Sequence, residues 1–167
     1  MTSDGDSVTV MALVRADRET TFEVFTEEID RWWRRGLAYR LGRDRSVVHL
    51  EPRLGGGLFE SFTSPSGKEH VKQTGTITAW EPPTRLVLTW RAVNFAPTEE
   101  TEVEVRFDES ASGTRVTLVH RGWSKIRPDH PARHGQEVAA FLAGLAQWWG
   151  GLATSLREHV LVRAATR

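Results

Sequence analysis

The sequence has no cysteine among its 167 residues. This absence excludes disulfides, thiolate metal ligands and cysteine nucleophiles, and it suits a reducing compartment. An excess of charge of one sign is also missing, because 22 lysines and arginines balance 22 aspartates and glutamates, for a formal net charge of zero at pH 7. Composition therefore excludes a strongly basic nucleic-acid-binding protein, and we expect no nucleic acid among the partners.

Long apolar runs are absent too. No stretch approaches the roughly 20 apolar residues that span a bilayer, so we expect no membrane insertion. Residues 1–7, MTSDGDS, have neither the basic flank nor the apolar segment of a signal peptide, which predicts a cytoplasmic location. With 39% hydrophobic and 26% charged residues, the composition is that of an ordinary globular domain. We expect one domain over residues 1–167, with flexible ends at 1–7 and 162–167.

The apolar pattern predicts a strand followed by two short helices at the start of the chain. Residues 8–14 alternate in the manner of a strand. Asp17 then offers a carboxylate that can cap a helix, and Phe22, Phe25 and Ile29 recur at helical intervals of three and four. We place the break between the two helices near Thr26, which can cap the second one.

The middle of the chain changes to a period of two, and the last third returns to a helical period. Six strand-like runs with short, turn-rich connections lie at 47–51, 58–63, 71–80, 85–91, 102–107 and 114–120. Short connections imply antiparallel pairing. From about 133 to 160 a single apolar stripe predicts one helix of about 42 Å, in which Gly144, Gly150 and Gly151 indicate a bend or a close approach. The fold class is therefore α+β: a curved antiparallel sheet of six or seven strands wrapped on a long carboxyl-terminal helix, with two short helices after the first strand.

This order of elements resembles the START-like (SRPBCC) superfamily and its helix-grip fold. The resemblance is carried by TFEVFTEEIDRWW at 21–33, EPRLGGGLFE at 51–60, GTITAWEPPTRLVLTW at 75–90 and GTRVTLVHRGW at 113–123. Within the superfamily, these stretches are similar to the branch homologous to the activator of the heat-shock-protein-90 ATPase. The resemblance implies a cavity between sheet and long helix that holds a small apolar or amphipathic molecule. It implies no universal catalytic residue, and we expect no cofactor.

Candidate pocket residues follow from the aromatic content and from the direction of side chains on strands and helices. The chain has seven tryptophans, whose apolar faces and polar edges suit a ligand pocket but equally suit a packed core. Adjacent helical residues point about 100° apart, so one member of each pair, Trp32-Trp33 and Trp148-Trp149, should face a cavity mouth. On the strand at 102–107, the alternation turns Glu104 to water. The predicted ligand-binding residues are Trp32, Trp33, Leu88, Trp90, Val105, Phe107, Leu118, His120, Trp123, Phe141, Leu145, Trp148 and Trp149.

His120 is the one candidate for proton transfer, because its strand position points inward and its ordinary pKa lies near 6.5. The alternative is a hydrogen-bonded core histidine. Glu60 is the carboxylate that can pair with it. The histidines lack the HxxxH or HExxH spacing on a helix, so no metal site is expected. Arginines around residues 36–44 form either a solvated surface or a region that attracts an anionic ligand to the cavity mouth.

Three functions are compatible with this sequence. The first is a module, monomeric or homodimeric, that binds a small apolar or amphipathic molecule without catalysis. The second is a cyclase or hydratase that uses the same cavity with His120 as proton shuttle. The third is a regulator of a chaperone ATPase. We rank it last, because the eukaryotic activators carry a separate amino-terminal domain with no counterpart in this sequence.

Overall fold

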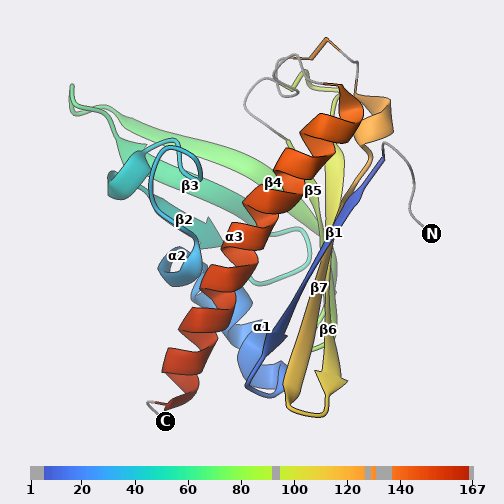
Figure 1. The fold of residues 1–167 in the computed structure, drawn as a ribbon. Helices are drawn as coiled ribbons and strands as arrows, with labels where there is room; N and C mark the ends of the chain where they lie inside the picture. The colour runs from blue at the N-terminus through green and yellow to red at the C-terminus, as the bar shows by residue number, and fades with distance from the viewer. Residues whose placement is uncertain (1–5, 92–94, 127–128, 131–136, 166–167) are drawn as a thin grey trace.

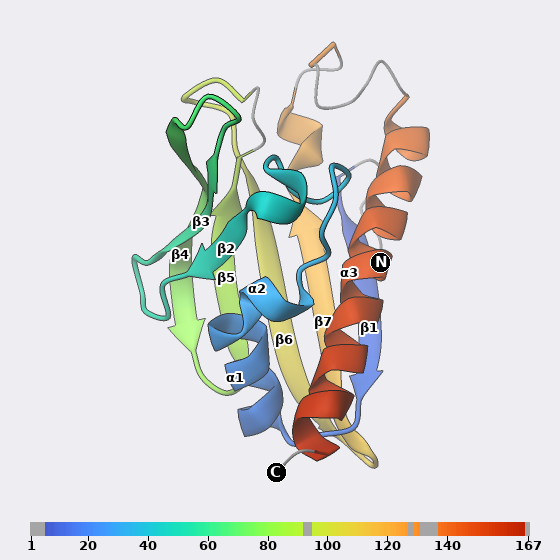
Figure 2. The same cartoon turned by 90° about the vertical axis from the view of Figure 1, so that its left-hand side faces the viewer.

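The computed structural model describes residues 6–91, 95–126, 129–130 and 137–165 (Figure 1). One long helix lies diagonally across a curved sheet, and two short helices lie beside it on the same face (Figure 2). In chain order the elements are β1 (Val8–Val14), α1 (Arg18–Glu27), α2 (Ile29–Trp32), η1 (Arg43–Arg45), β2 (Val47–Leu50), β3 (Gly57–Thr63), β4 (Glu69–Glu81), β5 (Arg85–Trp90), β6 (Thr101–Ser110), β7 (Gly113–Arg121), η2 (Trp123–Lys125) and α3 (Val138–Ala165).

The sheet has seven strands in the order β1-β7-β6-β5-β4-β3-β2, and each neighbouring pair is antiparallel. Its two edges are β1 and β2. The first strand pairs with the last along its whole length, from Val8 opposite His120 to Val14 opposite Thr114. The predicted α+β architecture is confirmed: a curved antiparallel sheet, a long carboxyl-terminal helix, and two short helices after the first strand.

The start of α1 follows the prediction, while the expected capping of α2 by Thr26 does not occur. The Asp17 carboxylate accepts a hydrogen bond from the backbone N–H of Thr20 at 2.7 Å, which satisfies one of the free donors at the helix start. The break between α1 and α2 lies at Glu28, close to the expected position. The Thr26 hydroxyl instead donates to the carbonyl of Phe22, one turn back, at 2.8 Å. Because Thr26 bonds within α1, it caps no second helix.

Helix α3 continues to Ala165, beyond the expected end at Val160. The expected start near 133 lies outside the described residues, as do residues 1–5 and 166–167 of the expected flexible ends. The expected close approach occurs at Gly151, where a Cβ atom would lie 2.5 Å from the hydroxyl oxygen of Tyr39. At Gly144 and Gly150 a Cβ atom would meet nothing within 4 Å.

The two faces of β6 separate the core from the outer surface. Val105 and Phe107 are fully buried on the concave face, as the alternation predicts. The expected exposure of Glu104 is wrong, since only 7% of this residue is accessible. Its carboxylate pairs with Arg85 at 2.6 Å and with Arg121 at 2.8 Å, and these side chains cover it. Burial raises its pKa, but the arginine hydrogen bonds and charges outweigh burial and lower it to about 2.

Candidate functional site

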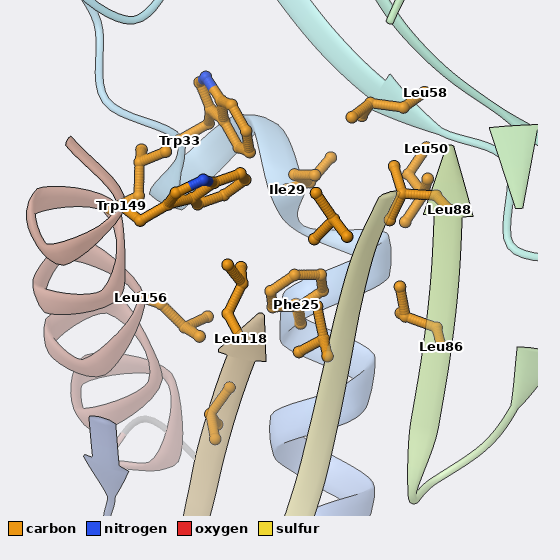
Figure 3. Close-up of a cluster of buried hydrophobic side chains, with 14 of the residues drawn as sticks. Phe25, Ile29, Trp33, Leu50, Leu58, Leu86, Leu88, Leu118, Trp149 and Leu156 are labelled. Carbon is orange, nitrogen blue, oxygen red and sulfur yellow. The ribbon is translucent and has the colours of Figure 1, made fainter. Parts of the chain in front are cut away.

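The space directly between α3 and the neighbouring strands β1 and β7 is almost filled. It retains a cavity of about 20 Å³, lined in part by Leu118, Trp149, Leu152 and Leu156. Figure 3 shows Leu118, Leu156 and Phe25 of α1 gathered in this part of the core, with the ring of Trp149 above them beside Trp33. A volume of this size has room for about one water molecule. The core beneath α3 therefore holds side chains rather than a pocket for a larger molecule.

A larger cleft lies nearby, between the chain that follows α2, strands β3 to β5, and the middle of α3. Its volume is about 350 Å³, within the usual range for small-molecule pockets. Its lining residues are Trp33, Leu37, Ala38, Tyr39, Arg40, Leu41, Val48, Leu58, Phe59, Glu60, Lys72, Thr74, Trp90, Arg91 and Trp148.

Three tryptophans form a continuous aromatic wall of this cleft. The ring of Trp33 stacks with that of Trp90 at a centroid distance of 6.2 Å, and it meets the ring of Trp148 edge-on at 5.9 Å. Trp32 and Trp149, the other members of the two tryptophan pairs, are buried in the core. One member of each pair, Trp33 and Trp148, lines the cleft; Trp33 follows α2 in an extended conformation, so its direction is not set by the geometry of that helix.

The indole N–H groups of two wall residues fix the segment 36–41, which we call the cleft loop. Trp148 donates to the carbonyl of Ala38 at 2.6 Å, and Trp33 donates to the carbonyl of Tyr39 at 3.1 Å. The ring of Tyr39 stacks on Trp148 at 5.4 Å. The polar edges of both indoles are therefore used for positioning the loop.

A buried arginine ties the cleft loop to α2. Arg40 is 1% exposed, and its guanidinium donates to the Asp30 carboxylate at 2.7 Å and to the carbonyl of Trp33 at 2.6 Å. Burial raises the pKa of Asp30, but the Val48 N–H and Arg40 outweigh burial and hold this pKa below its usual value. Arg35 also approaches Asp30, at 3.5 Å. Arg40, one of the arginines behind the basic excess predicted for this region, thus serves to hold the loop.

The polar end of the cleft contains Glu60 and Lys72, which face each other across β3 and β4. Each carboxylate oxygen of Glu60 accepts a backbone N–H, from Leu41 at 3.0 Å and from Gly42 at 2.8 Å. The ammonium of half-buried Lys72 donates to the carbonyl of Arg91 at 3.1 Å. Burial lowers the pKa of Lys72; the charge of Glu60 opposes this effect, and that of Arg91 adds to it.

His120 lies in the core and does not line the cleft. It is 0% exposed, and both ring nitrogens are occupied. Trp149 donates its indole N–H to Nδ1 at 3.1 Å, so the hydrogen bonds assign the ring proton to Nε2, which lies 2.7 Å from the Thr101 hydroxyl. That hydroxyl donates onward to the carbonyl of Trp90 at 3.1 Å. Burial lowers the pKa of His120 to about 3, so the ring is neutral at physiological pH.

Of the residues predicted to bind ligand, the structure brings Trp33, Trp90 and Trp148 together at the cleft. Leu145 is only partly buried at the edge of the core. The others are buried in the core: Trp32, Leu88, Val105, Phe107, Leu118, His120, Trp123, Phe141 and Trp149. Leu37, Tyr39, Lys72 and Thr74 line the cleft without having been predicted. For the first two, a signal exists in the sequence, since they are apolar residues in a basic, glycine-flanked segment.

Within the part of the chain that the structure describes, no three histidine, aspartate or glutamate side chains lie close enough together to hold a metal ion. The same residues include no helix with the combined length and apolarity needed to cross a membrane.

A curved antiparallel sheet gripping a long carboxyl-terminal helix, with a cleft at one end of the concave face, defines an α+β protein of the helix-grip class. The family described as "Activator of Hsp90 ATPase homolog 1-like protein" (AHSA1) matches residues 15–156. The chain belongs to this family, and the resemblance seen in the sequence is confirmed. No curated protein matches the sequence.

Solved structures with the same fold come from several bacteria. A protein from Nitrosomonas europaea has a TM-score of 0.64 and 17% identity, over 99% of this chain and 100% of its own. A protein of unknown function from Staphylococcus aureus has a TM-score of 0.68 and 15% identity, over 96% of each chain. An AHSA1-like protein from Aeromonas hydrophila has a TM-score of 0.60 and 18% identity, over 95% of this chain and 94% of its own. At these identities the likeness concerns the fold alone.

Proposed function

We propose that this protein binds a small apolar or amphipathic molecule in the cleft between the cleft loop, strands β3 to β5 and Trp148. The observation that carries the proposal is the cleft of about 350 Å³ with a wall of three tryptophans. Aromatic rings in a concave site offer large apolar contact with little conformational entropy to lose on binding. The aliphatic side chains of Leu37 and Leu58 extend the apolar lining.

The state of the acid–base groups favours binding over a reaction that uses His120. A proton shuttle needs a ring nitrogen that can reach a substrate and a pKa near the working pH. Both ring nitrogens of His120 are engaged inside the core, and its pKa lies far below that range. Glu60, the expected carboxylate partner, is bonded through both oxygens to backbone amides of the cleft loop and its continuation.

A bulky substitution in the cleft tests the proposal. Thr74 lines the cleft, whereas Thr78 lies on the same strand in an exposed position outside it. We expect 6-phenylhexan-1-ol, an uncharged amphipathic probe, to bind the wild-type protein in isothermal titration calorimetry. Thr74→Trp should abolish this binding because the indole fills the cleft, and Thr78→Trp should leave it unchanged. Equal effects of the two variants would contradict the proposal, as would failure of the wild-type protein to bind any amphipathic probe built on this phenylhexyl body.

The family description supports a second candidate, activation of the Hsp90 ATPase. The ATPase rate of purified Hsp90, measured with and without this protein, tests that function directly. Thr74→Trp separates the two candidates, because stimulation that survives in this variant does not depend on the cleft.

A further inference from the structure

The polar end of the cleft carries a positive charge that is not matched by an ion pair. Among the described residues, no carboxylate lies within 4.0 Å of the Lys72 ammonium, whose one hydrogen bond goes to the carbonyl of Arg91. An ammonium has three donor hydrogens. Lys72 can therefore donate further hydrogen bonds toward the cleft that it lines.

The neighbouring charged residues do not balance the positive charge of Lys72. The carboxylate of Glu60 already accepts two backbone N–H groups, which partly satisfy it. Arg91, also at the cleft, donates to the carbonyls of Pro97 and Ala96 at 2.7 and 2.8 Å, and it forms no ion pair with a described residue. The third cation, Arg40, is compensated by Asp30. Two cations therefore stand against the single carboxylate of Glu60.

Partial burial makes this arrangement costly without a ligand. Desolvation destabilises the charged form of Lys72, and its pKa is lowered for that reason. An anion placed against the ammonium gains more there than in open water, because charge-assisted hydrogen bonds strengthen when water is excluded. The aromatic wall lies in the same cleft.

We infer that the ligand is an anionic amphipathic molecule, with an apolar body against Trp33, Trp90 and Trp148 and a carboxylate that pairs with Lys72. This inference rests on the proposed binding function and specifies the chemical class of its ligand. The carboxylate of the ligand forms hydrogen bonds with the free donors of Lys72, and the positive charge of Arg91 nearby also attracts it. The apolar body requires no charged partner in the cleft.

The experiment compares three probes that share one apolar body and differ in head-group charge: 6-phenylhexanoate, 6-phenylhexan-1-ol and 6-phenylhexylamine. Calorimetric titrations at one fixed ionic strength keep screening constant. We expect the wild-type protein to bind the carboxylate about tenfold more tightly than the alcohol, as one good charge-assisted hydrogen bond predicts. The amine should bind more weakly than the alcohol.

Three variants assign the preference to Lys72. Lys72→Met keeps the aliphatic stem but removes the charge, so it should bind carboxylate and alcohol equally. Lys72→Arg keeps the charge and should keep the preference. Lys68→Met removes an exposed lysine from the β3–β4 turn and should behave as the wild type. Thermal unfolding verifies that each variant is folded. The comparison of the three probes on the wild-type protein tests the charge preference without any variant.

The outcomes separate this inference from the proposed function. Equal binding of carboxylate and alcohol to the wild-type protein would overturn the inference and leave the binding function standing. A preference that persists in Lys72→Met would overturn the assignment to this residue. Failure of all three probes to bind would overturn the binding function, and the inference with it.

Discussion

The imidazole of His120 acts as a neutral hydrogen-bonding group at the centre of the fold. It links α3 through Trp149 to β6 through Thr101, and Thr101 links onward to β5 through the Trp90 carbonyl. Protonation of Nδ1 would place two N–H groups against each other and would bury a positive charge. The folded state therefore resists protonation, which is the physical reason for a pKa of about 3.

This resistance predicts a dependence of stability on pH. In the unfolded chain a histidine has its ordinary pKa near 6.5, so below this pH the unfolded state binds a proton that the folded state does not. Stability falls as pH decreases from about 6.5 toward 3, with a slope of up to about 1.4 kcal/mol per pH unit from this one group. Urea unfolding of the wild-type protein and of His120→Gln at pH 7, 6 and 5 measures the slope.

We expect His120→Gln to be less stable than the wild type at pH 7, because the geometry of the Trp149 and Thr101 bonds changes. Its stability should nevertheless fall less steeply between pH 6 and pH 5. Parallel pH profiles of stability for the two proteins would contradict this prediction, because they would show that His120 contributes nothing to the pH dependence.

At the scale of elements, α3 and the cleft loop form one unit. Arg34 donates to the carbonyl of Gly151 at 2.9 Å, Trp148 donates to Ala38, and Tyr39 stacks on Trp148. The lack of a side chain at Gly151 allows the Tyr39 hydroxyl to come this close to the helix. The middle of α3 thus determines the position of one side of the cleft.

Two glycine substitutions in α3 test this coupling. Gly144→Ala should stabilise the protein by about 0.5 to 1 kcal/mol, because alanine favours a helix and its Cβ would meet nothing within 4 Å. At Gly151 the same substitution would push the Tyr39 hydroxyl aside. We expect Gly151→Ala to stabilise less and to weaken binding of 6-phenylhexan-1-ol, as measured by thermal unfolding and calorimetry. Equal stabilisation by both variants with unchanged affinity would contradict the coupling.

At the scale of the whole molecule, periodicity and turn chemistry were sufficient to predict the architecture. Alternation along β6 gave the correct inward face for Val105 and Phe107 because the period of a strand fixes the direction of its side chains. Periodicity also gave α3 and the antiparallel sheet. It missed the burial of Glu104, because arginines on two neighbouring strands cover that carboxylate.

The location of the cleft was much harder to predict than the fold. A period tells which side chains face inward, but whether they fill the space depends on segments distant in the sequence. Phe22 and Phe25 of α1 pack against Phe107 at ring distances of 5.0 and 5.6 Å, where the sequence placed ligand-binding residues. Lys72 carries no signal of its own, since alternation alone does not indicate that an ammonium lies beside a tryptophan wall.

The core beneath α3 and the cleft should therefore respond differently to mutation. Leu152 is 1% exposed and contacts the small cavity beneath the helix. Leu152→Ala should destabilise the protein by about 2 to 5 kcal/mol, as expected for a large-to-small change in a packed core, and should leave the affinity for 6-phenylhexan-1-ol unchanged. The matched control Leu161→Ala changes a residue that is 51% exposed on the same helix, and it should alter stability by about 0.5 kcal/mol or less. Urea unfolding and calorimetry measure both quantities. If Leu152→Ala instead changed affinity as strongly as Thr74→Trp while costing little stability, the ligand would bind beneath α3 rather than in the cleft.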